Sequence, residues 1–210
     1  GGALPRVWED RPPAGERLYS EPWFAGFQGG VRMNIFMTDL DPYLSAIALP
    51  DKLCVKMTLE TAQIASTVQH IHGTPEDILR EAGVVTTIGT VYRPTHPKHP
   101  SVLWAASSRD AYEWTVRHGL FIAKEYQYRF GRVHACHPVL WGLSSLKDRI
   151  PEARMQPVPM AMPDEYKRDD PIEAYRIYMN EAKRYYAKWT RRPPPDWWVS
   201  FDEVVEEVMA

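Results

Sequence analysis

The segment 51–71, DKLCVKMTLETAQIASTVQHI, restricts the fold more than any other part of the chain. Its polar side chains recur every three or four residues, which places them on one face of an α-helix. Most other positions are apolar or small, so the apolar arc is unusually wide. The pattern predicts a long helix that is buried nearly all round. Its polar row consists of Lys52, Lys56, Glu60, Gln63, Thr67 and His70.

Two interpretations of this polar row are open. In an ordinary amphipathic helix it would face solvent, with a Lys56–Glu60 pair worth about 0.3–0.5 kcal/mol. In a helix buried nearly all round it would line a cavity, where the polar groups pair with one another or with a ligand. We favour the cavity, because two other polar segments of the chain can contribute to the same pocket.

Capping residues and prolines divide the rest of the chain into helices. Asp41-Pro42 is an N-cap followed by Pro at the first helical position, and Thr74–Asp77 resembles a second helix start, with Gly83 as its stop. The prolines of 93–100 and 151–168 exclude a helix interior there. We expect helices over about 42–49, 51–71, 74–83, 108–130, 138–149, 171–190 and 201–209, and a strand or extended loop over 84–91.

These elements predict a mainly α fold, a single helical domain with long Pro-rich loops and at most a small β element. We expect an N-terminal extension at 1–32, a catalytic helical domain at 33–198 and an acidic tail at 199–210. Hydrophobic residues make up 44% of the 210 residues and charged residues 25%, which is typical of soluble globular proteins. No membrane segment or signal peptide is apparent. Two cysteines cannot form a disulfide scaffold, so a cytoplasmic location is expected.

The Pro-rich segment HPKHP, residues 96–100, is the second candidate for chemistry. His96 and His99 can bind phosphate, act as acid or base, or only satisfy backbone groups. Together with His134, Cys136 and His137 they could also bind zinc, but the spacing is not a standard metal signature. We therefore predict no metal and no cofactor.

Two helical segments combine aromatic rings with cations, a composition that suits a base and its phosphates. The first leads out of the helix 108–130, and its tyrosines can equally pack the core. The second runs from Glu181 to Arg192, with five basic residues against one acidic residue. The formal charge of the whole chain is only −2, so any nucleic-acid contact must be a local patch. The residues of the first are Tyr112, Tyr126, Tyr128, Arg129, Arg132 and His134, and those of the second are Lys183, Arg184, Lys188, Arg191 and Arg192.

Several common catalytic motifs are absent from the sequence. It contains no G-x-x-x-x-G-K-[ST], no G-x-G-x-x-G and no G-x-S-x-G. Nucleoside triphosphate hydrolysis, Rossmann-type cofactor use and serine-hydrolase chemistry are therefore disfavoured.

Four strings, taken in order, resemble a known group of proteins. NIFMTDLDPYLSAIALPDKLCVKMTLETAQI, HPKHPSVLW, AYEW and EYQYRFGRVH are similar to phage-type amino acid:DNA transferases of thymine hypermodification. MPDEYK and AYRIYMNEAKRYYAKWTRRPPPDWW extend that likeness, which covers about 33–198. The core pattern A-x-x-L-x-D-K-x-x-x-K-x-x-x-E-x-x-Q-I, with a later H-P-x-x-x-W, also resembles pyrimidine dimer DNA glycosylases.

The transferase resemblance implies an activity, partners and roles for particular residues. A separate kinase phosphorylates 5-hydroxymethyl-uracil in double- or single-stranded DNA, and the enzyme replaces that phosphate with the amino group of a free amino acid such as glycine or serine. The base must be extruded or exposed. If the gene is phage-encoded, the location is the host cytoplasm. The implied catalytic residues are Lys52, Lys56, Glu60, His96 and His99; the substrate-binding residues are Asp51, Gln63, Trp104, Tyr128, Arg129 and His134; and the basic residues from Lys183 to Arg192 contact DNA.

Two other functions remain open. A DNA glycosylase or lyase acting on damaged or modified pyrimidines would use Lys56 as an amine or Glu60 as a carboxylate. A non-catalytic DNA-binding protein would need only the basic aromatic segment. Cys54 departs from the resemblance, where an apolar residue or His is expected; it is either a nucleophile or, as is more common, a small buried hydrophobe.

Overall fold

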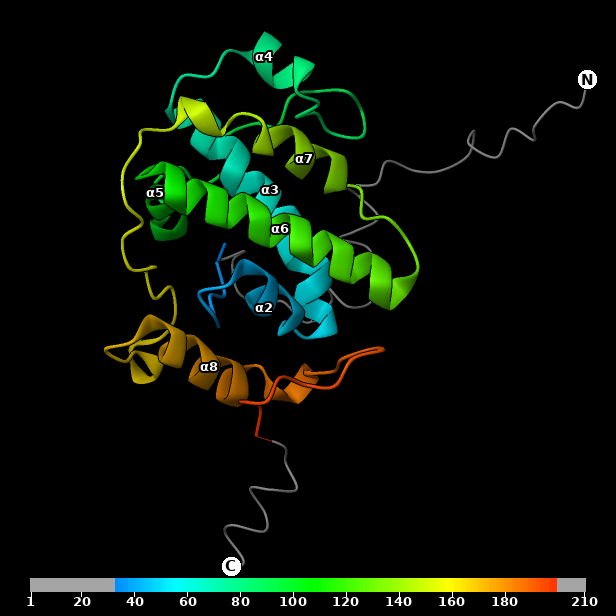
Figure 1. Cartoon of the computed structure of the whole chain (residues 1–210), viewed down its shortest axis with the longest axis vertical. Coiled ribbons are helices and arrows are strands. Elements are labelled where there is room, and N and C mark those ends of the chain that lie inside the picture. Colours follow the sequence, from blue (N-terminus) through cyan, green and yellow to red (C-terminus); the bar gives the residue numbers. More distant parts are fainter. Residues whose placement is uncertain (1–32, 200–210) are drawn as a thin grey trace, which may run out of the picture.

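The structure is a computed structural model that describes residues 33–199, and it is mainly α-helical as predicted. Two long helices, α3 and α6, pack against each other at the centre of the structure (Figure 1). Shorter helices surround this pair. The α-helices of the described range are α2 (Pro42–Ile47), α3 (Asp51–Ile71), α4 (Glu76–Glu81), α5 (Pro100–Ala106), α6 (Arg109–Phe130), α7 (His137–Ser144) and α8 (Pro171–Ala182).

Local sequence signals set most helix ends. The Asp41 side chain accepts a hydrogen bond from the Tyr43 N–H, and the Ser108 side chain accepts one from the Ala111 N–H. At the end of α6, Gly131 has a φ of 69°, a left-handed conformation that glycine adopts without steric cost. The helix predicted over 51–71 is confirmed at both ends.

The centre of the core is the contact between α3 and α6. Gly119 of α6 makes the close approach possible, because a Cβ atom at this position would lie 2.6 Å from Cγ2 of Thr61 in α3. The Cys54 thiol lies beside the Ile122 carbonyl at 3.7 Å in the same interface. α2, α5 and α7 pack around this pair.

A second layer contains α8 and the segments that lead into and out of it (Figure 1). The extended residues 33–37 are buried beside this layer, and the Tyr175 hydroxyl of α8 donates to the Asn34 side-chain oxygen at 2.9 Å. The Asn34 amide in turn donates to the Ala161 carbonyl at 3.0 Å in the Pro-rich connection. Residues 33–37 therefore form part of the core.

Two predicted helices end earlier than expected, and one helix was not predicted. The helix predicted over 171–190 ends at Ala182 and is followed by a 3₁₀ turn, Arg184–Tyr186, because residues further on leave the helix to contact α3. The helix predicted over 138–149 is α7, followed by the 3₁₀ turn Lys147–Arg149. Helix α5 was not predicted; Pro100 occupies its first position, where a missing N–H costs nothing.

The predicted β element is minimal. Within residues 33–199, the segment 84–91 contributes one isolated antiparallel bridge, Val85 to Val91. The expected extension 1–32 and the expected helix 201–209 lie outside the described residues. None of the helices between residues 33 and 199 combines the length and apolarity needed to cross a membrane.

Candidate functional site

The polar row of α3 is only partly buried: Glu60 and Thr67 are buried, whereas Lys52, Lys56, Gln63 and His70 are half-buried. The cavity expected along this row stays a prediction. The Lys56 Nζ lies 2.9 Å from Glu60 Oε1, one helical turn away. The Glu60 side chain is 3% exposed and that of Lys56 16% exposed. An ion pair at this spacing on the surface would be screened by water and weak. The Lys56–Glu60 pair is largely shielded from water, so removing one partner would leave a poorly hydrated charge.

Glu60 has few polar partners for a buried carboxylate. The Lys56 ammonium, at 2.9 Å, and the Asn34 backbone N–H interact with it, but neither oxygen has a well-aligned hydrogen bond within residues 33–199. Burial raises the pKa of the carboxyl above its ordinary value of 4.5, against the opposing effects of the Lys56 ammonium, the Asn34 backbone N–H and His96. Glu60 is thus a buried carboxyl group whose pKa is raised above its ordinary value.

The Pro-rich loop that carries the two histidines is attached to the polar row of α3. The Thr67 hydroxyl accepts a hydrogen bond from the Thr95 N–H at 2.9 Å and donates one to the Gln63 carbonyl at 2.7 Å. One turn further on, His70 Nε2 donates to the Tyr92 carbonyl at 2.7 Å. These contacts hold the residues before His96 against α3.

His96 and His99 have different environments in this loop. His96 is exposed, has a φ of 49° and is near enough to stabilise the Glu60 carboxylate by its charge. His99 caps α5, because its Nδ1 accepts from the Ser101 N–H at 3.2 Å. Burial, and then His96, lower the pKa of His99 below its ordinary value of 6.5. Neutral His99 therefore carries its proton on Nε2.

The other end of the polar row meets the C-terminal part of the chain. The Lys52 Nζ lies 5.1 Å from the centre of the Tyr186 ring. The Tyr186 hydroxyl is buried and has no hydrogen-bond partner among residues 33–199. The row thus extends from an aromatic contact at Lys52 to the histidine loop at His70.

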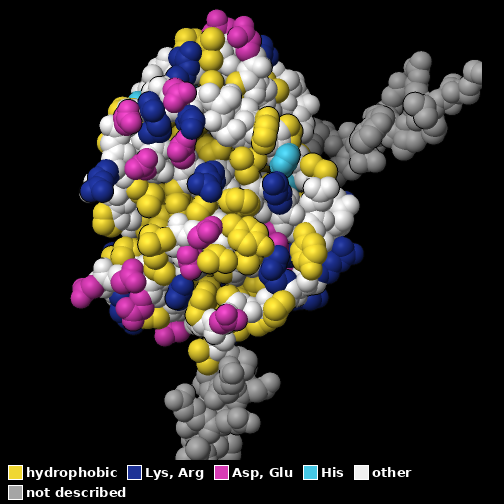
Figure 2. All heavy atoms as spheres, in the orientation of Figure 1, with side chains coloured by type: hydrophobic (Ala, Val, Ile, Leu, Met, Phe, Trp, Pro, Cys, Tyr) yellow, Lys and Arg dark blue, Asp and Glu magenta, His cyan; other side chains and the backbone are white. Residues whose placement is uncertain are grey.

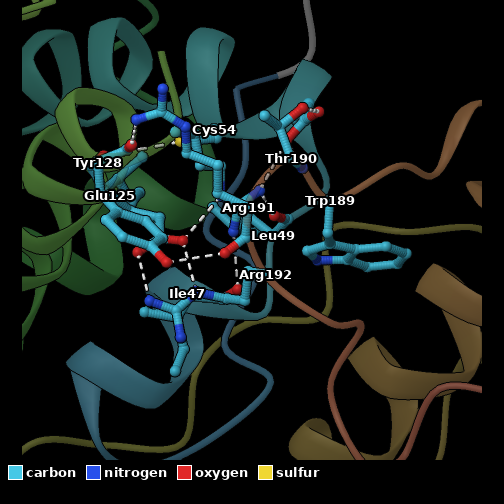
Figure 3. A network of polar contacts seen from close by, with 12 residues as sticks. Ile47, Leu49, Cys54, Glu125, Tyr128, Trp189, Thr190, Arg191 and Arg192 are labelled. Carbon is cyan, nitrogen blue, oxygen red and sulfur yellow. Dashed lines mark hydrogen bonds and ion pairs between the residues drawn. The ribbon is translucent and has the colours of Figure 1, made fainter. Parts of the chain in front are cut away.

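Asp51 and Arg129, two predicted substrate-binding residues, belong instead to a network of polar contacts. Figure 3 shows Glu125, Leu49 and Thr190 of this network. The fully buried guanidinium of Arg129 donates to Glu125 at 2.8 Å, to Asp51 at 3.1 Å and to the Leu49 and Ile47 carbonyls. Asp51 also accepts from the Thr190 hydroxyl at 2.7 Å. Arg129 donates four hydrogen bonds inside the protein and the Asp51 carboxylate accepts three, so the structure gives both residues a positional role.

The remaining predicted substrate-binding residues are dispersed. The Trp104 Nε1 donates to the Gln156 carbonyl at 2.7 Å, and the ring packs edge-on against Trp114. Tyr128 is half exposed, and its hydroxyl donates to the Arg191 carbonyl at 2.8 Å. His134 is buried, and burial lowers its pKa to about 4. Gln63 is half-buried in the row itself.

The predicted DNA-binding residues do not form one helical face, since α8 ends before them. Lys183 lies over the Tyr178 ring at 4.5 Å, and the Arg184 Nε donates to the Asn180 carbonyl. Arg192 forms two bonds to Glu125, at 2.6 and 2.9 Å (Figure 3). Arg191 donates to the Tyr128 carbonyl. Lys188 is exposed. Most of this positive charge is used in intramolecular contacts.

The two cysteines and the histidines considered as zinc ligands do not form a metal site within residues 33–199. Burial raises the pKa of the Cys54 thiol to about 12, which suppresses the thiolate that a nucleophile requires. His134 Nδ1 accepts from the Cys136 N–H at 3.1 Å. Within the described part of the chain, no group of three or more His, Cys, Asp or Glu side chains is arranged to hold a metal ion.

The structure adds two residues to the site that the sequence did not indicate as functional. Asn34 contributes its backbone N–H to Glu60, and its side chain is fixed by Tyr175 and Ala161. Tyr186 covers Lys52. Both are far from α3 in sequence. Asn34 begins the first string of the resemblance, which was the one available signal.

Comparisons with known proteins do not assign the chain to a family. No protein-family model, no curated protein and no solved structure matches it. Its function is therefore inferred from the residues and their geometry.

Proposed function

We propose that the protein is an enzyme that acts on a modified pyrimidine base in DNA. Its reaction is the replacement of the phosphate on phosphorylated 5-hydroxymethyl-uracil by the amino group of a free amino acid, the activity that the sequence resemblance implies. The observation that carries the proposal is the Lys56–Glu60 pair, whose buried carboxyl group has a raised pKa and is close enough to His96 to be affected by its charge. Buried titratable groups with perturbed pKa values are typical of active sites.

The proposed step needs a base, an anion site and a positioned amine. The amine nitrogen forms a bond to the methylene carbon on C5 of the base. The bond from that carbon to the phosphate oxygen breaks, and its electron pair leaves with the phosphate. Glu60 accepts the proton that the nitrogen loses, a role that suits a carboxyl group with a raised pKa.

Cationic groups near Glu60 suit the departing phosphate. Lys52 and Lys56 supply positive charge along one side of α3, and neutral His99 supplies an N–H donor. Because phosphate departure increases the negative charge on the leaving oxygen, these groups stabilise the transition state more than the ground state.

The direct test supplies DNA containing phosphorylated 5-hydroxymethyl-uracil and each of the twenty amino acids, followed by mass analysis of the nucleosides. With at least one amino acid, we expect a nucleoside whose 5-methylene carbon is bonded to the amino nitrogen of that amino acid. Glu60→Gln should lower its rate of formation about 100-fold or more. Glu81→Gln, which removes an exposed carboxylate at the end of α4, is the matched control and should retain the wild-type rate.

The same geometry also suits a glycosylase or lyase, because an amine and a carboxylate lie 2.9 Å apart. In that case the Lys56 amine would attack the sugar and form an imine with DNA. Borohydride would then trap a covalent complex that Lys56→Arg abolishes, and no amino acid would be incorporated. A trapped complex that depends on Lys56, together with no incorporation of an amino acid, would refute the transferase proposal and support a glycosylase or lyase.

A further inference from the structure

A shallow groove lies on the side of α6 that faces away from α3. Its volume is about 160 Å³. Leu120 and Phe121 are half-buried, whereas 68% of the Trp141 surface is exposed. Figure 2 shows basic side chains beside a histidine and exposed hydrophobic side chains on this face, over α6 and α7. The lining residues are Arg117, Leu120, Phe121, Lys124, His137 and Trp141.

This groove is separate from the Lys56–Glu60 site. Thr61 and Cys54 of α3 contact Gly119 and Ile122 of α6. The polar row of α3 is on the other side of that helix, and Arg117 and Lys124 are on the other side of α6. The α3–α6 pair therefore separates the two sites.

The two cations of the groove are available for a ligand. Arg117 and Lys124 are exposed, and neither has an ion pair or a hydrogen-bonded side-chain partner within residues 33–199. They contrast with Arg192 and Arg184, whose side chains are used internally. The nearest acidic side chain on the same face of α6, Glu113, is paired with Lys147 at 2.6 Å.

The spacing of these cations favours a polyanion over a small anion. Arg117 and Lys124 are two helical turns apart, about 10 Å along the axis. At this separation the two side chains can pair with different phosphates of one nucleic acid strand. The exposed Trp141 indole, beside Phe121, offers a face on which an unpaired base can stack.

We propose that this groove, formed by Arg117, Lys124 and Trp141 over Leu120 and Phe121, binds single-stranded nucleic acid. A base stacks on Trp141, and neighbouring phosphates pair with Arg117 and Lys124. A duplex would offer only its phosphates, because its bases are already stacked. The binding does not depend on the proposed reaction, so it can be tested in the Glu60→Gln variant as well as in the wild-type protein.

The test measures fluorescence anisotropy of a labelled oligothymidylate, with a blunt duplex and anionic lipid vesicles as competitors. We expect Trp141→Ala to weaken single-strand binding about tenfold. Tyr185→Ala, which removes an aromatic ring that is 81% exposed elsewhere, is the matched control and should change the affinity less than twofold.

The salt dependence tests the two cations independently. For a single strand, each phosphate contact contributes about 0.7 to the slope of log K against log salt. Arg117→Ala combined with Lys124→Ala should therefore reduce the slope by about 1.4, and Arg154→Ala, an exposed arginine outside the groove, should not. Circular dichroism confirms that the variants fold.

Three results would overturn the proposal. The first is an affinity that Trp141→Ala and the double variant leave unchanged. The second is competition by the duplex that equals competition by the single strand. The third is preferential binding to anionic vesicles. Failure of the transferase assay with intact groove binding would refute the proposed reaction alone.

Discussion

A carboxyl group as deeply buried as that of Glu60 is ionised only if its surroundings compensate for the lost hydration. Lys56 compensates in part, yet the pKa of Glu60 stays above 4.5 because burial dominates. A buried polar group with incomplete compensation destabilises the fold, and proteins retain such groups mainly at functional sites.

The pH dependence of the reaction should reflect this balance. The acid limb of kcat/KM should report Glu60 and lie above pH 4.5, because only the carboxylate accepts a proton. Lys56→Gln should move that limb to higher pH, since the ammonium is the largest effect that lowers the pKa. Glu81→Gln should leave it in place. An acid limb that moves to lower pH in Lys56→Gln would contradict this assignment.

His134 should make folding stability depend on pH. Its pKa is about 4 in the folded protein and near 6.5 when exposed, so the unfolded chain takes up a proton first as the pH falls. Neutral, buried His134 therefore contributes up to about 3 kcal/mol to the free energy of unfolding above pH 6.5. This contribution is lost as the pH falls from 6.5 to 4.

Urea denaturation at several pH values measures this contribution. His134→Asn retains an acceptor for the Cys136 N–H but does not titrate, so its free energy of unfolding should fall less steeply over this pH range. Gln127→Asn, at an exposed position in α6 that does not titrate, is the control and should retain the wild-type slope. An unchanged slope in His134→Asn would assign the acid sensitivity to other groups.

At the scale of elements, the distance between α3 and α6 depends on Gly119. Replacing it with Ala would place Cβ 2.6 Å from the Thr61 Cγ2 and 2.8 Å from the Leu140 Cδ2. Alanine favours the helix by about 1 kcal/mol, but overpacking a core typically costs about 1–3 kcal/mol.

We therefore expect Gly119→Ala to lower the free energy of unfolding by up to about 2 kcal/mol. Thr61→Ser removes the nearest methyl group and should recover part of the loss in the double variant. Denaturant titration of both single variants and the double variant measures the coupling. If Gly119→Ala proves as stable as the wild type, the helices can separate at little cost.

At the scale of the whole molecule, the Arg129 network joins three distant parts of the chain. It connects the start of α3, the end of α6 and residues 188–192 of the C-terminal segment (Figure 3). Asp51 contributes its backbone N–H to the Lys188 carbonyl and its carboxylate to Thr190. These contacts also hold the C-terminal segment that carries Tyr186 beside Lys52.

Removing Arg129 should therefore be among the most damaging changes in the protein. Arg129→Met leaves two carboxylates, those of Glu125 and Asp51, without their buried partner, a loss that typically costs about 3–5 kcal/mol. Limited proteolysis should then cleave residues 187–192 faster. Arg191→Met, an exposed arginine on the same segment, should cost about 1 kcal/mol or less. Equal losses in the two variants would refute the central role of Arg129.

The sequence by itself determined the elements whose signals are local. The caps at Asp41 and Ser108 and the repeating pattern of 51–71 fix α2, α6 and α3, because they depend on residues within a few positions of one another. The cavity that the wide apolar arc led us to expect along the polar row stays a prediction, because Glu60 is buried but Lys56 is half-buried.

Which side chains contact one another across the sequence became known only from the packing of the helices. Arg129 and Asp51 have the residue types of a binding site, but distant carbonyls and Thr190 engage them, a contact that no local pattern encodes. The end of α8 at Ala182 has the same cause, since Asp51 draws residues 188–190 out of the helical path. Long-range contacts outweigh helix propensity here because the weak preference of a few residues is smaller than the gain from pairing a buried charge.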